Sequence, residues 1–349
     1  MIVMRIGILL FVSDIIRAER FAFVGDWGVP SDVGLGKTVA SITNRSQEGL
    51  DFIVLGGDNF YETGVSSVAD PQFNSTYKRY FDQLPGSIPR YVILGNHDHF
   101  GNVLAQVLYS QKESTWNMDY YFYTRFFRFD TSSLCGVFID TDRMNQAGQI
   151  PFITASLARR ECQESDFIIV FGHHPMYSRG GHGDSSQLQS QLEQIFVTYH
   201  VDAYVAGHDH LLDCQINKNV LHIVSGAGGK KTTSSWYTSQ SSAEKQLFSS
   251  FGQFGYTFFS TSQGLLKIEF IDSEKDIVLF THSIESQRSR RTTSPDPKAN
   301  SAVAESAIAG SRPWDSVHVF ALSFTIFLSW IIGLFAIEPK KFTQIIFSS

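Results

Sequence analysis

Short apolar runs recur along the first two thirds of the chain, and each is followed by glycine and a polar residue. The runs are Phe21–Val24, Phe52–Leu55, Tyr91–Leu94, Phe167–Val170 and Ala203–Ala206. Apolar runs of this length, bounded by glycines, indicate buried strands of a parallel sheet. Because sites in open α/β sheets form beyond the carboxyl ends of such strands, we expect five strands to present Asp, Asn or His at one edge of one sheet.

Helical segments alternate with these runs. They span residues 35–48, 71–84, 150–162 and 187–200. This alternation predicts right-handed crossovers around a parallel core. The aromatic segment 109–130 is typical of antiparallel strands, and 136–142 returns to the buried-strand pattern. From residue 219 onward short β-like segments follow, at 220–225, 264–270 and 276–284. The predicted class is therefore α/β with a largely β second half, an α+β arrangement.

The C-terminal part has a different composition. Residues 285–313 are rich in Arg, Ser, Ala and Pro, which predicts a flexible stalk. Residues 317–337 are 21 predominantly apolar residues, enough for a transmembrane helix, with a buried core helix as the alternative. Lys340 and Lys341 favour a short cytosolic tail over 338–349, suited to recruit a cytosolic partner. These features predict a single-pass type I membrane protein whose domain is luminal or extracellular.

The N-terminal residues 1–20 resemble a secretory signal peptide or leader, because Arg5 precedes the apolar run 6–12. Asp14 and Arg17 interrupt the pattern, so a first strand or an uncleaved leader is the alternative. Glycosylation triplets begin at Asn44 and Asn74, and they matter only if the chain enters the secretory pathway.

Composition narrows the class of function. The 349 residues, 43% of them hydrophobic, can bury the core of one large domain or of two. With 28 basic and 34 acidic residues the net charge is −6, and no basic block indicates nucleic acid as a partner. The three cysteines allow at most one internal disulfide and leave one thiol over.

Polar side chains at the strand ends form a candidate metal site. They are Asp26, Asp58, Asn96, His173, His208 and His210. Carboxylate, amide and imidazole ligands together suit Fe, Mn or Zn. The period of two along a strand lets His208 and His210 face the metals while Asp209 turns aside. Asp58 is a candidate bridge between two ions roughly 3.5–4 Å apart, a pair that activates water and clamps a phosphoryl group.

At these residues the sequence resembles the calcineurin-like metallophosphoesterases. The motifs that carry the resemblance are Gly25-Asp26, Gly56-Gly57-Asp58-Asn59, Gly95-Asn96-His97-Asp98, Gly172-His173 and Gly207-His208-Asp209-His210. Gly25-Asp26-Trp27-Gly28 and Asp58-Asn59-Phe60-Tyr61 are similar to the small, mammalian-type purple acid phosphatases, and the similarity runs over a domain from 21 to 284. The resemblance implies two mixed sheets packed face to face between helices.

The same resemblance implies an acid phosphatase that hydrolyses phosphomonoesters with a dinuclear metal centre and a metal-activated hydroxide. It assigns Fe(III) to Asp26, Asp58, Tyr61 and His210, and Fe(II), Zn(II) or Mn(II) to Asp58, Asn96, His173 and His208. It implies that His97 and His182 hold the substrate and assist the leaving group, roles that suit the pKa of histidine.

Two alternatives follow from the predicted membrane span. The glideosome-associated anchor proteins of apicomplexan parasites are membrane-anchored relatives that keep the phosphatase fold and can lose metal ligands. This chain could therefore be an anchor or receptor of a motor complex with little or no activity. An adhesive or receptor ectodomain without metal is the third hypothesis, but it leaves the ligand-type residues and Tyr61 unexplained.

Overall fold

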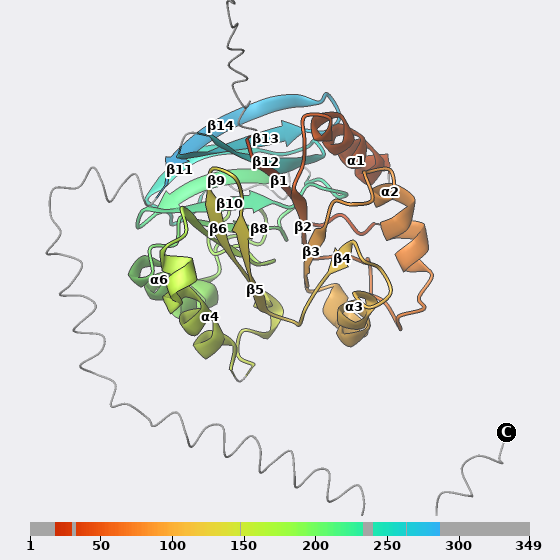
Figure 1. Ribbon diagram of the computed structural model, residues 1–349, viewed down its shortest axis with the longest axis horizontal. Coiled ribbons are helices and arrows are strands. Elements are labelled where there is room, and N and C mark those ends of the chain that lie inside the picture. The colour runs from red at the N-terminus through yellow and green to blue at the C-terminus, as the bar shows by residue number, and fades with distance from the viewer. Residues whose placement is uncertain (1–17, 30–32, 147, 233–239, 263, 287–349) are drawn as a thin grey trace, which may run out of the picture. The chain divides into compact units, whose positions relative to one another are not determined.

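Two seven-stranded mixed sheets face one another in the computed structural model, which describes residues 18–29, 33–146, 148–232, 240–262 and 264–286 (Figure 1). The first sheet contains, in spatial order, β14 (Ile277–Glu285), β13 (Leu265–Asp272), β12 (Gly255–Ser262), β1 (Arg20–Val24), β2 (Phe52–Gly56), β3 (Arg90–Ile93) and β4 (Trp116–Asn117). The second contains β11 (Lys245–Ser250), β9 (Leu212–Asn217), β10 (Val220–Ser225), β8 (Ala203–Ala206), β7 (Phe167–Phe171), β6 (Ser133–Phe138) and β5 (Tyr123–Arg128). The predicted α/β class with two mixed sheets is confirmed.

The five strands that carry the motifs are divided between the sheets. β1, β2 and β3 are parallel neighbours in the first sheet, and β7 and β8 are parallel neighbours in the second. The expectation of one edge of one sheet is therefore wrong. Between β3 and β7 the chain crosses over, because β5 pairs with β6 and β6 with β7. A continuous apolar run reports that a strand is buried on both faces, but it does not report which sheet buries it.

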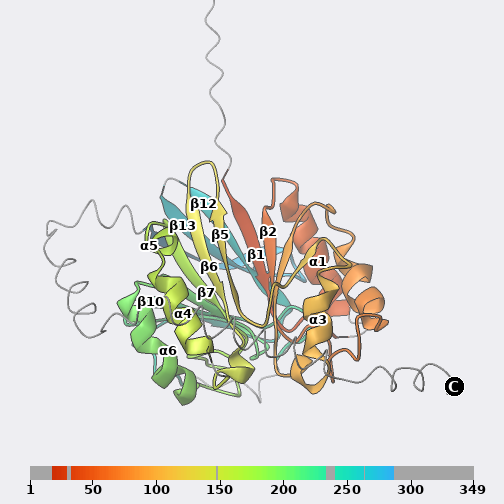
Figure 2. The same cartoon turned by 60° about the horizontal axis from the view of Figure 1, so that its bottom comes forward.

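Helices cover the outer faces. They are α1 (Val33–Ser46), a π-helical segment (Phe73–Lys78) that continues into α2 (Arg79–Phe81), α3 (Val103–Tyr109), α4 (Gln149–Ala158), α5 (Arg160–Gln163) and α6 (Ser186–Thr198), with 3-10 turns at Asp98–Phe100 and Thr141–Arg143. Figure 2 places α4 and α6 beside the second sheet and α1 and α3 on the opposite side of the molecule. The predicted helix 150–162 is broken at Arg159, whose backbone is extended.

The core follows the alternation of side chains along the strands. On β7, Ile169 and Phe171 belong to the cluster between the sheets, whereas Ile168 and Val170 pack with α4 and α6. Aromatic stacking joins the two sheets, since the ring centroids of Phe52 on β2 and Phe127 on β5 lie 4.2 Å apart. Burial on both faces explains why these strands are continuous apolar runs.

Several predicted boundaries need correction. The strand predicted at 136–142 is β6, which begins at Ser133 and ends at Phe138. A 3-10 turn, Thr141–Arg143, occupies the end of the predicted segment. Within 109–130, β5 is antiparallel to β6 as expected, but β4 is parallel to β3. Strands β9 (Leu212–Asn217), β11 (Lys245–Ser250) and β12 (Gly255–Ser262) were not predicted from the sequence.

One disulfide joins β6 to α5 beneath the outer face of the second sheet. Cys135 and Cys162 form it, and Cys214 on β9 is a buried free thiol. The described residues contain no helix long and apolar enough to span a bilayer. The predicted leader 1–20, stalk 285–313, span 317–337 and tail 338–349 lie wholly or largely outside the described residues.

Candidate metal centre

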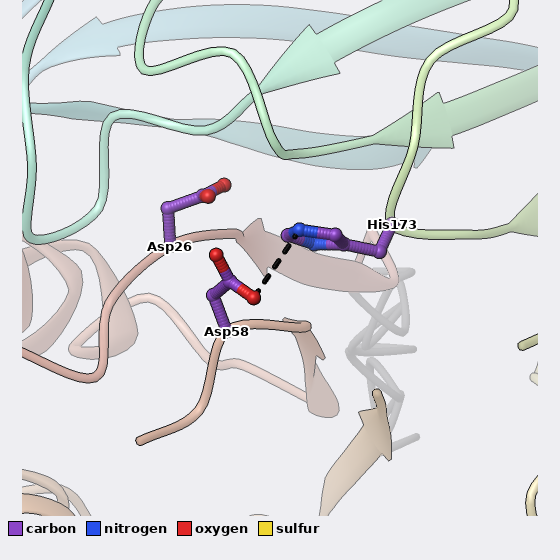
Figure 3. Close-up of side chains that lie close together, drawn as sticks. All are labelled: Asp26, Asp58 and His173. Atoms are coloured by element: carbon purple, nitrogen blue, oxygen red, sulfur yellow. Dashed lines mark ion pairs between the residues drawn. The ribbon is translucent and has the colours of Figure 1, made fainter. Parts of the chain in front are cut away.

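The carboxyl ends of β1, β2 and β3 meet those of β7 and β8 where the two sheets face each other. Figure 3 shows Asp26, Asp58 and His173 pointing toward one another across this junction. One ligand-type atom from each of these three residues lies within 4.8 Å of the other two. All three side chains are buried. The junction thus gathers oxygen and nitrogen donors from both sheets around one small space.

Three side chains form a first group on the side of β1. The Tyr61 hydroxyl donates a hydrogen bond to Asp26 Oδ1 at 3.0 Å and lies 3.3 Å from His210 Nε2. The remaining pair, His210 Nε2 and Asp26 Oδ1, is 3.4 Å apart. A phenol, a carboxylate and an imidazole therefore converge, as the resemblance predicted for the ferric site.

Four side chains form a second group around the ends of β2 and β7. His173 Nε2 lies 3.4 Å from Asp58 Oδ1 and 3.2 Å from Asn96 Oδ1. His208 Nδ1 lies 3.0 Å from the same oxygen of Asn96. Asp58 also has a ligand-type oxygen within 4.8 Å of one of Asp26 in the first group, so it is placed to bridge two ions. The structure thus places all seven predicted ligands together, and their metal binding stays a prediction.

The backbone at this junction is in an uncommon conformation. Asp26, Asp58 and His208 have φ values of 57°, 52° and 69°, in the left-handed region that few residues other than glycine adopt. Hydrogen bonds between residues far apart in the sequence hold these positions, since Asp26 Oδ2 accepts from His208 N at 2.7 Å and Asp58 Oδ1 accepts from His97 N at 2.9 Å. Such conformations persist where the surrounding contacts hold them, and they cluster at functional sites.

Glycine beside Asp58 is required by close approach. A Cβ atom on Gly57, whose φ is +85°, would lie 2.5 Å from His173 Nδ1. That nitrogen instead donates to the carbonyl of Gly56 at 2.9 Å, which directs Nε2 toward Asp58 and Asn96. The glycines of the Gly56-Gly57-Asp58 motif therefore bring the β2 loop against the imidazole.

Electrostatics favour a cation in this space. Burial lowers the pKa of His173, but Asp58 and Asp26 outweigh burial and raise it to about 10. Burial raises the pKa of Asp58, and the charge on His173 holds it well below its usual range. Without metal the two carboxylates thus keep a proton on His173. A donor set of carboxylates, an amide oxygen, a phenol and imidazoles, with a positive charge drawn into it, fits a pair of metal ions.

Two further histidines stand at the rim of the site. His97 Nδ1 lies 2.6 Å from the carbonyl oxygen of Glu62, and its Nε2 lies 4.0 Å from Asp58 Oδ2. The His182 ring centroid lies 4.2 Å from that of His208. Both are more exposed than the buried Asp58.

The strand alternation expected for His208, Asp209 and His210 is wrong, because β8 ends at Ala206 and His208 has a φ of 69°. Asp209 contacts a partner that the sequence did not indicate. Its Oδ1 accepts from His182 N at 3.1 Å and from His182 Nδ1 at 2.8 Å. Its Oδ2 accepts from Ser178 Oγ. Asp209 therefore fixes both the loop and the ring of His182, and the hydrogen bond from its ring raises the pKa of His182.

Sequence reasoning gave no role to two supporting residues. Asp98 is fully buried and accepts hydrogen bonds from Gly95 N, Asn59 N and Gln106 Nε2 at 2.9, 3.1 and 2.8 Å. Thr141 Oγ1 accepts from the backbone N of His173 at 3.2 Å. The Gly95-Asn96-His97-Asp98 motif contained Asp98, but no local pattern distinguishes a carboxylate that supports a loop from one that binds metal.

Comparisons with known proteins identify the family of this chain. The family described as calcineurin-like phosphoesterase matches residues 19–212. Human tartrate-resistant acid phosphatase type 5 is 36% identical over 242 residues, which cover 60% of this chain and 73% of that protein. Glideosome-associated protein 50 of Plasmodium falciparum is 26% identical over 309 residues, 76% of each chain.

Solved structures give the same result for the fold. A structure described as "GAP50 the anchor in the inner membrane complex of Plasmodium" superposes with a TM-score of 0.71 at 27% identity, covering 77% of this chain and 89% of that one. Purple acid phosphatase PPD1 from yellow lupin superposes with a TM-score of 0.61 at 18% identity, over 77% and 54% of the two chains, and it supports the fold alone. The chain belongs to the calcineurin-like metallophosphoesterases and is homologous to the purple acid phosphatases and to the apicomplexan protein GAP50.

Proposed function

We propose that this protein is an acid phosphatase of the purple type that hydrolyses phosphomonoesters. The observation that carries the proposal is the convergence of all seven ligand side chains in two groups joined by Asp58. The first group would hold Fe(III), and the second Fe(II), Zn(II) or Mn(II). A bound metal pair supplies an activated water and neutralises charge that develops on the phosphoryl group.

The rim histidines serve the substrate in this proposal. His97 has one ring nitrogen against the Glu62 carbonyl, so its Nε2 is the atom that faces the site and can contact a phosphoryl oxygen. His182 is held through Nδ1 by Asp209, and the raised pKa keeps it protonated to a higher pH than a free histidine. A protonated His182 can give its proton to the oxygen of the departing alcohol.

Membrane attachment is the second part of the proposal. The residues from 285 onward would form a stalk, a single span and a cytosolic tail, which leaves the metal centre luminal or extracellular. The buried Cys135–Cys162 disulfide supports this side of the membrane, because such bonds form and persist in oxidising compartments. Protease protection of intact microsomes tests it: the tail should be digested, and shielding of the tail would mean an inverted topology.

An anchor of the GAP50 type is the second candidate function. Its support is the length of the similarity, which covers 76% of both chains and extends beyond the residues matched by the family. Anchoring would use the span and the tail, whereas chemistry would use the junction of the sheets. The two functions are compatible, so the experiment has to measure the chemistry directly.

Metal analysis and turnover on aryl and alkyl phosphates at acidic pH separate these hypotheses. We expect the full-length protein in detergent to hold two metal ions and to hydrolyse phosphomonoesters. Asn96→Ala should lose metal and activity, while Asn145→Ala, which removes the same amide from an exposed position outside the predicted ligand set, should keep both. Metal-replete protein without turnover would favour the anchor, and metal-free wild type would favour the receptor.

A further inference from the structure

A lysine stands over the ring of the proposed phenolate ligand. The Nζ atom of Lys230 lies 3.6 Å from the centroid of the Tyr61 ring. This is well within the roughly 6 Å at which a cation and an aromatic face attract each other. The hydroxyl group of the same Tyr61 ring contacts Asp26 and His210. One ring therefore contacts a positive charge through its face and the predicted metal ligands through its oxygen.

The loop that carries Lys230 is held on both sides by the ligand loops. Before it, Gly229 N donates to the carbonyl oxygen of Asp26 at 3.1 Å. After it, Thr232 N donates to the carbonyl oxygen of His210 at 2.7 Å. Gly229 also approaches the ligand loop closely, because a Cβ there would lie 2.7 Å from the carbonyl oxygen of Trp27. Hydrogen bonds to the backbone of two predicted ligands thus fix the position of the Lys230 backbone.

The side chain of Lys230 has one acidic neighbour at the rim. Its Nζ lies 3.4 Å from Glu62 Oε1, and Glu62 is mostly exposed. His97 also approaches that carboxylate, with Nδ1 3.6 Å from Oε2. An ion pair with a solvent-exposed carboxylate holds a lysine only weakly. Tyr61 is buried, so the interaction of the ammonium with the ring takes place at the protected end of the side chain.

We propose that Lys230 tunes the Tyr61 ligand, and that its ammonium limits the electron density which the phenolate donates to the metal ion. This inference rests on the proposed iron site. The positive charge over the ring stabilises the electrons of the phenolate more than those of an ion on the far side of the oxygen. It therefore widens the energy gap for charge transfer from phenolate to iron. Lys230 is a positioning residue for the electronic state of the centre and contacts no reacting atom.

The visible spectrum of the full-length protein loaded with Fe(III) and Zn(II) measures this effect. Lys230→Met should move the charge-transfer band to longer wavelength, and Lys230→Glu should move it further. Lys230→Arg should keep the wild-type position, because a guanidinium also interacts with an aromatic face. Metal content and circular dichroism, measured on the same samples, check that each variant is folded and loaded with metal. If Lys230→Met does not fold or bind metal, Lys230→Gln replaces it as the neutral variant.

Lys231 provides a matched control in the same loop. Its Nζ lies 4.6 Å from the centroid of the Phe254 ring and 3.3 Å from Glu274 Oε2. Lys231→Met removes an equal charge without uncovering Tyr61, so the band should stay in place. If the band has the wild-type wavelength in both Lys230→Met and Lys231→Met, the inference is overturned while the proposed iron site stands. An iron-loaded wild type without any visible band would overturn the proposed site and the inference together.

Discussion

Asp98 is the residue whose removal tests most directly how the fold holds the metal centre. Its buried carboxylate accepts from Gly95 N and Asn59 N, and these two backbone groups adjoin the predicted ligands Asn96 and Asp58. A third donor, Gln106 Nε2, comes from α3. Asp98→Ala leaves these three buried donors without that acceptor. We therefore expect one change to loosen the β2 and β3 loops together.

The cost can be estimated from the number of donors. A buried donor without a partner costs about 1–3 kcal/mol, so three donors at the lower end of that range cost about 3 kcal/mol of unfolding free energy. In a domain of this size 1 kcal/mol corresponds to roughly 2–4 °C in Tm, so we expect a decrease of about 6–12 °C. Asp98→Asn keeps one oxygen and the shape of the side chain, and its loss should be smaller.

Thermal unfolding of chelator-treated protein, followed by circular dichroism, measures the structural part without any contribution from bound metal. Metal content after reconstitution measures the positioning part. Asp82→Ala is the matched control, because Asp82 is an exposed carboxylate paired with Lys78, and its loss should lie within about 0.5 kcal/mol. A Tm within 2 °C of the wild type, where ~2 °C corresponds to less than one lost donor, would refute the estimate. A lower Tm with full metal content would refute the positioning role.

Three other predictions concern the site and the chain beyond it. Tyr61→Phe should abolish the visible band of iron-loaded protein with little change in fold, because only the phenol oxygen is lost; a persistent band would assign the colour to another ligand. Asp209→Asn should lower the pKa of His182, which the hydrogen bond to Asp209 raises, so the alkaline limb of the pH–rate profile should move to lower pH as the protonated form is lost earlier; an unmoved limb would remove His182 as the acid. A chain that ends at Ser311 should stay in solution without detergent with unchanged kcat/KM, whereas sedimentation or loss of turnover would place part of the site beyond the predicted stalk.

The buried strands were predictable because each is apolar on both faces. β8 was predicted with its observed bounds, and β1, β2 and β7 within one residue. β9 was missed because three of its residues, Asp213, Gln215 and Asn217, are polar and buried. Arg179, from a different loop, lies 3.0 Å from Asp213. A strand whose interior polar groups find partners far along the chain has no local hydrophobic pattern to reveal it.

In the site, too, local sequence patterns were predictive and long-range contacts were not. Each predicted ligand lies next to a strand end that a local motif marks, and the structure brings those positions together although they lie in two sheets. The supporting contacts are long-range. Lys230 contacts Tyr61 and also Glu62, which lies 168 positions earlier in the sequence. Thr141 contacts His173, which lies 32 positions later. No spacing rule connects such pairs, so only the folded chain shows them.

The strain at the junction bears on whether the site is used. A protein that only anchors a complex needs the two sheets, but it does not need Asp26, Asp58 and His208 in left-handed backbone conformations, which cost of order 1–3 kcal/mol each where the surroundings impose them. It also does not need two buried carboxylates that keep a proton on His173. Bound cations would interact favourably with these carboxylates, and the left-handed conformations would then serve to aim ligands rather than only to destabilise loops. Metal addition should therefore stabilise this protein against unfolding far more than it stabilises Asn96→Ala, and that difference would exist whether or not the span also serves an anchor.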